Sequence, residues 1–360
     1  MTNNVINYYV SGNTAKGFHS LLETNISGIR LIVINGNYQL IKSNLMKSMS
    51  DIWRKRGYNL EILHCASNND YIEGVINRDI GVGIIDGNDR HKIDSSLIDT
   101  MIDTDSTLEK NSLVMNIEDI IYLEDKIIDN YKKAYEYFEN ALKVHDEWEE
   151  IYISNMNRLS ANSYSDAVIN NIISNTIIDK KADVKHRFFG AATPNGPIDF
   201  IENITSNVQK RYFIKGRPGT GKSTLLKRLV KKASSNGIDV EVYHCGFDPN
   251  SLDMVILREL DIVIFDSTAP HEYYPSREND EVIDMYAKII AQGTDEKYED
   301  ELNSIIERYK YDVDEATHYL KTVKKLNDKI ETYYSKAFNS NKFESIKENL
   351  ISIILKYEKK

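Results

Sequence analysis

A stretch in the second half of the chain has the residue types and spacing of a phosphate-binding loop. Its sequence is Gly216-Arg217-Pro218-Gly219-Thr220-Gly221-Lys222-Ser223-Thr224, which fits the pattern G-x-x-x-x-G-K-[ST] at every defined position. Glycines let a backbone curl around a polyphosphate, so that N–H groups and a helix N-terminus point at its negative charge. We therefore expect all of these residues to surround the phosphates of a bound nucleotide.

Three side chains are the first candidates for the chemistry. Lys222 would reach the β- and γ-phosphates, and the Ser223 hydroxyl would help to hold Mg²⁺. Asp266 ends the apolar run 262–266, where a Walker B carboxylate would orient the same ion. The sequence therefore predicts Lys222 and Asp266 as catalytic residues, and Ser223 and Asp266 as the metal site. The alternative for Asp266 is a carboxylate that caps the next turn.

Other residues near the loop are less specific. His271, five residues past Asp266, could contact the γ-phosphate, accept a proton or satisfy a loop carbonyl, and we include it among the catalytic candidates. Arg258 could stabilise charge as an arginine finger, although an exposed helix arginine is the commoner case. A zinc site at His244 and Cys245 is disfavoured because neighbours on a strand point to opposite faces.

The sequence repeats itself after about 180 residues. At a shift of 180, 16 of the 58 residues from 34 to 91 are identical without a gap. The matches include Lys42-Ser43 on Lys222-Ser223, His64-Cys65 on His244-Cys245, Asp86 on Asp266 and His91 on His271. Farther on, a helical stretch matches at a shift of 182. We expect two domains, a degenerate one over residues 1–180 and an intact one over 181–360.

The first copy has lost the features that make room for phosphate. It keeps a lysine and a serine, but it has Gln39 and Ile41 where the second copy has Gly219 and Gly221. A β-branched side chain just before the lysine would project where the backbone should approach the phosphates. We therefore expect nucleotide to bind only in the second half, with the first half in a structural or regulatory role.

Each copy has the pattern of a short parallel α/β unit. Three apolar, strand-like runs are separated by a helix and then by a loop with a short helix, which predicts parallel βαβ units. The last third of each copy has apolar residues at alternating spacings of four and three, which predicts a long helix that needs a partner. The expected fold class is α/β, with two tandem P-loop NTPase-like units, each a short parallel sheet flanked by helices with a long helical C-terminal extension.

The partner of each long helix is open at this level. The favoured interpretation is that it packs on the shorter C-terminal helix of its own half. The alternative is an arm that reaches the other half or another chain.

Composition narrows the class of protein. Apolar residues make up 41% and charged residues 28% of the 360 residues, as in ordinary globular proteins. The net charge of −10 argues against binding to nucleic acid, which concentrated Lys and Arg would favour. No apolar run approaches the roughly 20 residues of a membrane span, and the polar N-terminus lacks a signal-peptide core. Two cysteines fit a reducing compartment, so we expect a cytoplasmic protein.

The residues after the third strand narrow the nucleotide class. Asp266 is followed by Ser267, so the water-activating Glu of many motor-type ATPases is missing. A D-x-x-G switch and an N-K-x-D guanine reader are also missing from the sequence. We therefore expect ATP with Mg²⁺.

The chain resembles a bacterial family of uncharacterised tandem P-loop ATPases, some of them described as nucleotide-kinase-like. The resemblance covers both halves and rests on I-K-G-R-P-G-T-G-K-S-T (214–224), H-C-x-x-D-P-x-S-L-D (244–253) and D-S-T-A-P-H (266–271), where the family usually has D-G-T-A-P-H. It implies NTP binding and hydrolysis but supplies no substrate. Family members often look intact in both loops, so the loss at Gln39 and Ile41 is a departure.

Three functions are compatible with this pattern. The leading one is a Mg²⁺-dependent ATPase whose helical segments couple nucleotide state to a protein partner. The second is a kinase that transfers the γ-phosphate to a small molecule in a pocket lined by Asp248, Asp253 and Arg258. The third is a nucleotide-sensing scaffold with negligible turnover.

Overall fold

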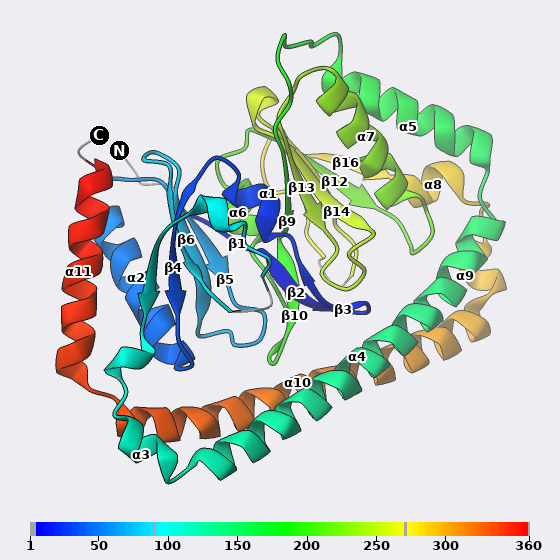
Figure 1. The fold of residues 1–360 in the computed structure, drawn as a ribbon. Coiled ribbons are helices and arrows are strands. Elements are labelled where there is room, and N and C mark those ends of the chain that lie inside the picture. The colour runs from blue at the N-terminus through cyan, green and yellow to red at the C-terminus, as the bar shows by residue number, and fades with distance from the viewer. Residues whose placement is uncertain (1–4, 89–90, 270–271, 359–360) are drawn as a thin grey trace.

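The computed structural model describes residues 5–88, 91–269 and 272–358. Within them, twelve strands form one continuous sheet that runs through both halves of the chain, in the order β16-β12-β15-β14-β13-β9-β1-β5-β6-β7-β4-β8 (Figure 1). Six of the pairings that build this sheet are parallel and five are antiparallel. The fold is therefore mixed α/β, as the sequence predicts.

The two halves of the sheet have the same strand order, read outward from the centre. In the second half the strands are β9 (Val184–Phe188), β13 (Val240–His244), β14 (Leu252–Leu257), β15 (Ile262–Asp266), β12 (Lys210–Lys215) and β16 (Glu281–Asp284). In the first half they are β1 (Val5–Tyr9), β5 (Leu60–His64), β6 (Ile72–Asn77), β7 (Val82–Asp86), β4 (Arg30–Asn35) and β8 (Ile98–Asp103). This correspondence extends the repeat seen in the sequence to the topology.

One strand of each half was expected as a loop with a short helix. That stretch forms β6 or β14, which lies antiparallel to both of its neighbours in the sheet. The run Leu252–Leu257 is almost wholly buried, and a short apolar run without clear alternation does not distinguish a buried strand from a helix. The expectation of an all-parallel short sheet is therefore wrong in this part of each half.

The halves meet at the centre of the sheet through a buried charge cluster. Strands β1 and β9 pair there in antiparallel orientation. The Arg187 guanidinium lies 3.1 Å from a Glu61 carboxylate oxygen and 3.4 Å from one of Glu241, and it stacks 4.2 Å from the Tyr8 ring centroid. Burial alone would raise the pKa of Glu61, but the charges of Arg187 and Arg78 outweigh burial and lower it to about 2. Each of these buried charges has a partner within the cluster. Loss of one partner would leave an unpaired buried charge and would strongly destabilise the fold.

Helices of the two copies are exchanged across the sheet. The first copy ends in α5 (Arg158–Ile173), which packs with α7 (Lys222–Ser235) on the second half. The second copy ends in α11 (Ser340–Glu358), which packs on the first half, over α2 (Gln39–Lys55) and its strands. Figure 1 shows α5 and α11 at opposite sides of the molecule.

The exchange runs through two long helices, α4 (Ile117–Ser154) and α10 (Glu299–Ala337). They lie side by side and antiparallel, and the pair spans both halves (Figure 1). The Tyr137 and Tyr319 rings stack with centroids 5.7 Å apart, and Arg308 lies 2.7 Å from Glu147. The favoured expectation, packing on the C-terminal helix of the same half, is therefore wrong, and the alternative of an arm to the other half is what the structure has. The local pattern shows that a helix needs a partner, but not which one.

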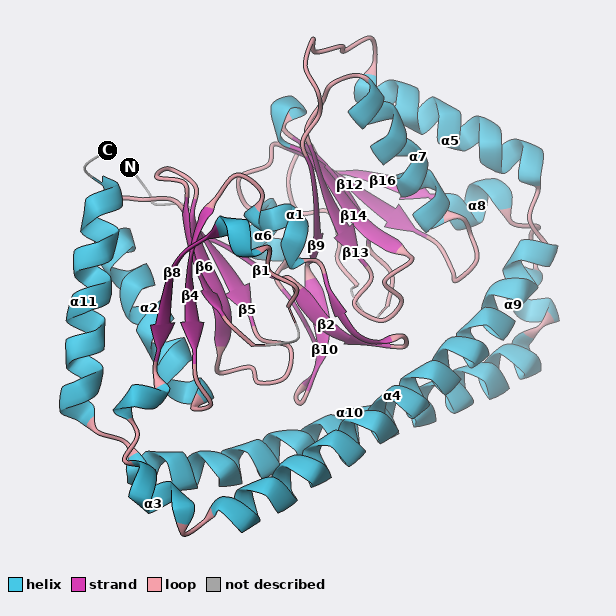
Figure 2. Ribbon diagram, viewed as in Figure 1, coloured by secondary structure: helices cyan, strands magenta, loops and turns pink. Residues whose placement is uncertain are grey.

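Two hairpins lie between the sheet and this helix pair (Figure 2). They are β2 (Ser11–Thr14) with β3 (Gly17–Ser20), and β10 (Gly190–Thr193) with β11 (Gly196–Asp199). The remaining helices are α1 (Leu22–Ile26), α3 (Lys110–Val114), α6 (Ile201–Thr205), α8 (Met285–Ile289) and α9 (Thr294–Lys297), with 3-10 turns at Ser95–Leu97, Asp105–Thr107 and Arg258–Leu260.

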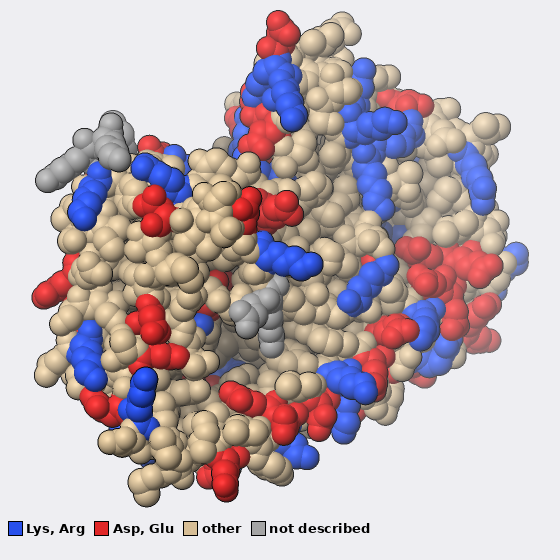
Figure 3. All heavy atoms as spheres, viewed as in Figure 1, with Lys and Arg blue, Asp and Glu red and all other residues tan. Residues whose placement is uncertain are grey.

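The surface of the long helix pair carries charges of both signs. Figure 3 shows acidic and basic side chains interspersed along it, which is typical of a solvated helix face. Among the described residues, none of the helices is both long enough and apolar enough to cross a membrane.

Candidate nucleotide-binding site

The predicted phosphate loop lies between the end of β12 and the start of α7. Gly219 and Gly221 have φ values of +73° and +80°, in the left-handed region that glycine adopts without steric cost. The Thr220 N–H and hydroxyl both donate to the Arg217 carbonyl, at 3.3 and 2.7 Å, and close the curl. Gly221 is the N-cap residue of α7, so the positive end of that helix faces the loop.

Lys222 and Asp266 face each other across this loop. Lys222 Nζ lies 3.5 Å from Asp266 Oδ2 and donates to the Arg217 carbonyl at 2.8 Å. The other Asp266 oxygen accepts from the Thr268 N–H at 3.0 Å and from its hydroxyl at 2.5 Å. Asp266 therefore caps the next turn with one oxygen and presents the other to Lys222, so both interpretations of this residue have support.

Ser223 and the remaining loop residues take different positions. The Ser223 hydroxyl accepts from the Leu252 N–H at 2.9 Å, which ties the start of α7 to β14 and leaves its proton and a lone pair for other partners. Arg217 pairs with Asp295 at 2.9 Å, which directs it to the outside of the curl. Gly216 is buried, Pro218 is half-buried and Thr224 is exposed on the first turn of α7.

Helix α4 packs directly against the loop. A Cβ built on Gly219 would lie 2.5 Å from the carbonyl oxygen of Glu149 and 2.9 Å from its Cα. Gly219 is therefore required by this close approach as well as by its backbone conformation. No sequence pattern links residues 149 and 219, although the polar interruption of the apolar stripe at His145 marks the same part of α4.

The turn of α4 at this contact is rich in polar groups. His145, Asp146 and Glu149 offer ligand atoms that all lie within 4.8 Å of one another, and His145 Nδ1 is 3.9 Å from Glu149 Oε1. Burial lowers the pKa of His145, the Glu149 charge raises it, and the Lys222 charge also acts to lower it. His145 is thus within electrostatic reach of the loop lysine.

The stretch of the first half that matches the phosphate loop, residues 36–43, forms no open loop. Helix α2 begins at Gln39, so the residues that match Gly219, Thr220 and Gly221 are helical. Lys42 Nζ lies 2.7 Å from Asp86, with both side chains buried, and the Gln39 amide donates to the other Asp86 oxygen. The lysine and aspartate that would serve a nucleotide are therefore paired with each other.

Helix α10 contacts this closed loop in the way that α4 contacts the open one. Glu331, which matches Glu149 at the shift of 182, accepts from the Leu40 backbone and from the Tyr71 hydroxyl. Tyr334 stacks on Tyr38, with ring centroids 5.7 Å apart. A carboxylate from α10 thus lies at the N-terminal end of α2, where a helix favours an anion.

The arginine-finger and acceptor-pocket expectations are not met. Arg258 pairs with Glu241 at 3.0 Å. Because β14 runs antiparallel to its neighbours, this residue lies at the end of the sheet away from the loop. Asp248, Asp253 and Arg258 therefore do not line one pocket. His271 lies outside the described residues.

The histidine of the His-Cys pair takes part in a hydrogen-bonded chain. His244 contacts His186 at 2.8 Å and the Pro249 carbonyl at 2.6 Å. Burial, the largest effect, lowers the pKa of His244 to about 4. This arrangement is that of a neutral, hydrogen-bonded histidine at a strand end.

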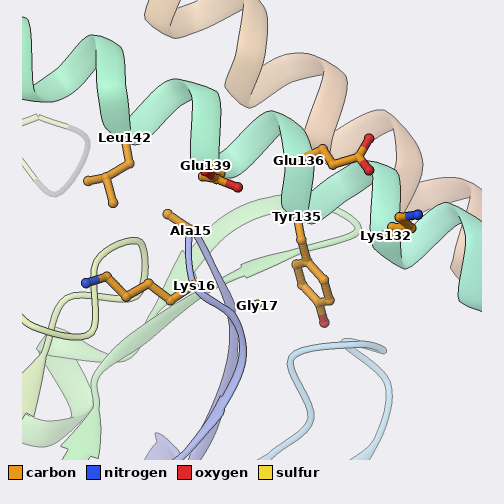
Figure 4. Close-up of a pocket in the computed structure, with 8 residues that line it drawn as sticks. All are labelled: Ala15, Lys16, Gly17, Lys132, Tyr135, Glu136, Glu139 and Leu142. Carbon is orange, nitrogen blue, oxygen red and sulfur yellow. The ribbon is translucent and has the colours of Figure 1, made fainter.

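A cavity of about 560 Å³ lies farther along α4. Figure 4 shows the tip of the β2–β3 hairpin, Ala15 to Gly17, facing Tyr135, Glu139 and Leu142 of α4. The residues that line it do not include any from the phosphate loop. It is a separate feature of the hairpin and helix interface.

Comparisons of the chain with protein-family models, with curated proteins and with solved structures found no match. The geometry of the loop and its surroundings is therefore the basis for a functional assignment.

Proposed function

We propose that the chain is a Mg²⁺-dependent ATPase with one nucleotide site, at residues 216–224. The observation that carries this proposal is the loop geometry: two left-handed glycines lead into α7, and Lys222 Nζ lies 3.5 Å from Asp266 at the end of β15. In this interpretation each half is a P-loop NTPase-like unit, and the first half has lost its site.

Each residue has a definite role in the proposal. The loop amides and the start of α7 bind the β- and γ-phosphates, and Lys222 neutralises them. Ser223 and Asp266 would hold Mg²⁺, which would supply positive charge to the transferring phosphoryl group. For that step Lys222 must exchange its contact with the Arg217 carbonyl for the phosphates.

The first half serves as a scaffold and as a route for regulation. In the first half α2 begins at Gln39 and takes the place of the loop, and Lys42 is buried against Asp86, so no backbone curl is left to receive a phosphate. Helices α4 and α10 connect the two halves. A protein partner that binds the long helix pair would sense the nucleotide through the contact of α4 with Gly219.

A specific observation keeps the kinase and the sensing scaffold as second candidates. Ser267 takes the place of a water-activating Glu, is fully buried, and donates to the Tyr273 carbonyl at 2.5 Å. A kinase needs no activated water, and a sensor needs little turnover.

Phosphate release by the purified chain with Mg²⁺ and ATP tests the proposal. We expect steady release that Lys222→Ala lowers by about 10²-fold or more, because a positive charge aimed at the transferring group is lost. The matched control is Arg228→Ala. Arg228 is a cation on the outer face of the same helix and pairs with Asp166, so its loss should leave phosphate release unchanged.

The other outcomes separate the candidates. Release that does not depend on Lys222 contradicts the proposal. ATP binding without release indicates the sensing scaffold. Label from γ-³²P-ATP that appears on a metabolite, with release only in its presence, indicates the kinase.

A further inference from the structure

We propose that Glu149 of α4 is the carboxylate that orients and deprotonates the water attacking the γ-phosphate at the loop of the second half. The inference rests on the proposed function, because it assigns a role at the same site. It makes the site composite, since α4 belongs to the first copy of the repeat and the loop to the second.

The second copy lacks such a group at the usual place. Ser267 follows Asp266, and its hydroxyl is used up by two contacts with the backbone of Tyr273, at 2.5 and 3.2 Å. Asp266 is engaged with Thr268 and faces Lys222, and the proposed function assigns it to Mg²⁺. A hydrolase still needs a positioned acceptor for the proton of water, which contributes about 10²–10⁴-fold to a rate.

Glu149 lies at the right place on α4. Its main chain packs on Gly219, with 2.5 Å from its carbonyl oxygen to a Cβ built there. Its side chain is 37% exposed, which leaves the carboxylate accessible to a ligand. His145, one turn earlier on the same face, is close enough to Lys222 for the lysine charge to act on its pKa. Because Gly219 and Lys222 belong to the same loop, this turn of α4 lies beside the residue that would hold the γ-phosphate.

The first half shows that a glutamate at this position reaches the loop. Glu331 has the same position on α10 and accepts a hydrogen bond from the backbone of Leu40. Leu40 matches Thr220, the residue between the two left-handed glycines of the open loop. A carboxylate on this turn can thus reach the backbone of the loop, and the pseudo-symmetry of the fold places Glu149 at the equivalent position beside the open loop.

The step balances with water as the only added reactant. The water oxygen forms a bond to Pγ, its proton passes to a Glu149 oxygen, and the bond from Pγ to the bridging oxygen breaks. The electron pair of that bond leaves with ADP, and inorganic phosphate is the second product. Repulsion between Glu149 and the polyphosphate is offset by Lys222, Mg²⁺ and the start of α7.

The test compares Glu149→Gln with Glu150→Gln. The two changes remove the same charge from adjacent positions, and Glu150 is exposed to solvent. ATP binding is measured by titration calorimetry, and turnover by the conversion of enzyme-bound γ-³²P-ATP with Mg²⁺. Thermal unfolding of each variant shows whether it folds like the wild type.

We expect Glu149→Gln to bind ATP with a Kd within about threefold of wild type. Its turnover should fall by about 10²-fold or more, with the bound nucleotide remaining ATP. Glu149→Asp should restore part of the rate, because it returns a carboxylate, whereas Glu150→Gln should behave as wild type. Loss of a merely structural contact would weaken binding and turnover together and would not trap ATP.

Three results would overturn the inference. They are wild-type turnover in Glu149→Gln, equal losses in Glu149→Gln and Glu150→Gln, and loss of turnover in His145→Asn but not in Glu149→Gln. Failure of the proposed function is seen separately, as a wild-type chain that neither binds ATP nor releases phosphate.

Discussion

At the residue scale, the two loops differ by a few substitutions with large structural effects. Gly219 and Gly221 hold left-handed backbone in the second half. Their counterparts Gln39 and Ile41 are the first and third residues of α2 in the first half. The helix extends into the place of the loop, and the lysine that both copies keep is drawn onto Asp86.

Replacing Gly221 with Ile should reproduce this loss in the second half. A left-handed conformation costs a non-glycine residue about 1–2 kcal/mol, and the side chain would project toward the phosphates. The nearest atom to a Cβ built there is Met285 Cε at 3.9 Å, so the core is not disturbed. We expect ATP affinity to fall by more than about 10-fold, measured by calorimetry.

Gly196→Ile is the matched control for that change. Gly196 also has a positive φ, of +90°, with nothing within 4 Å of a built Cβ, but it is the first residue of β11, next to the turn of the β10–β11 hairpin. We expect Gly196→Ile to lower the free energy of unfolding to a similar extent and to leave ATP affinity unchanged. Equal losses of affinity in the two variants would show that the effect is general destabilisation.

At the element scale, the exchange of α5 and α11 sets which helix covers which half of the sheet. Ile354 and Leu350 of α11 are fully buried in the same cluster as Trp53 of α2. Glu358 of α11 also pairs with Arg56, just past the end of α2. The last helix of the chain therefore completes the core of the first half.

Ile354→Ala should lower the free energy of unfolding by about 2–5 kcal/mol, the cost of emptying a buried aliphatic site. Both proteins, with and without Ile354→Ala, are compared in a Trp148→Phe background, in which Trp53 is the single tryptophan. Urea unfolding followed by Trp53 fluorescence then reports on the first half. Glu348→Ala, at an exposed position of α11, is the control. Unchanged stability in Ile354→Ala would mean that α11 packs elsewhere.

The sequence predicts the elements that carry local signals. The glycine-rich turn before α7, Asp266 at a strand end and the long amphipathic helices all depend on neighbouring residues, and the structure has each of these elements. That the turn binds phosphate stays a prediction. The repeat predicts that Lys42 and Asp86 match Lys222 and Asp266. It does not predict that the first pair is closed at 2.7 Å, which follows from the early start of α2.

Long-range features were not predictable from the same signals. Strand β14 is defined by its two antiparallel neighbours, and its short apolar run suits a helix equally well. The pairing of α4 with α10 depends on which of several apolar faces meet. The contact between Glu149 and Gly219 joins residues 70 positions apart, so it is visible only in the folded chain.

At the scale of the whole molecule, a duplicated chain has become one asymmetric body. The sheet is continuous through the buried Arg187 cluster, and the antiparallel α4 and α10 place one turn of each long helix on the loop of the other copy. The two equivalent positions thus make different contacts: Glu331 reaches the closed loop with its carboxylate, and Glu149 packs its main chain on the open loop. The proposed single site is a property of this arrangement as a whole.

The central claim is one functional nucleotide site per chain, at residues 216–224. Titration of the purified chain with ATP and Mg²⁺ in a calorimeter measures the stoichiometry directly, and Lys222→Ala and Lys42→Ala assign the site. We predict one ATP per chain in the wild type, binding that is lost in Lys222→Ala, and binding that is kept in Lys42→Ala. Two sites per chain, or a single site that survives Lys222→Ala, would contradict the account.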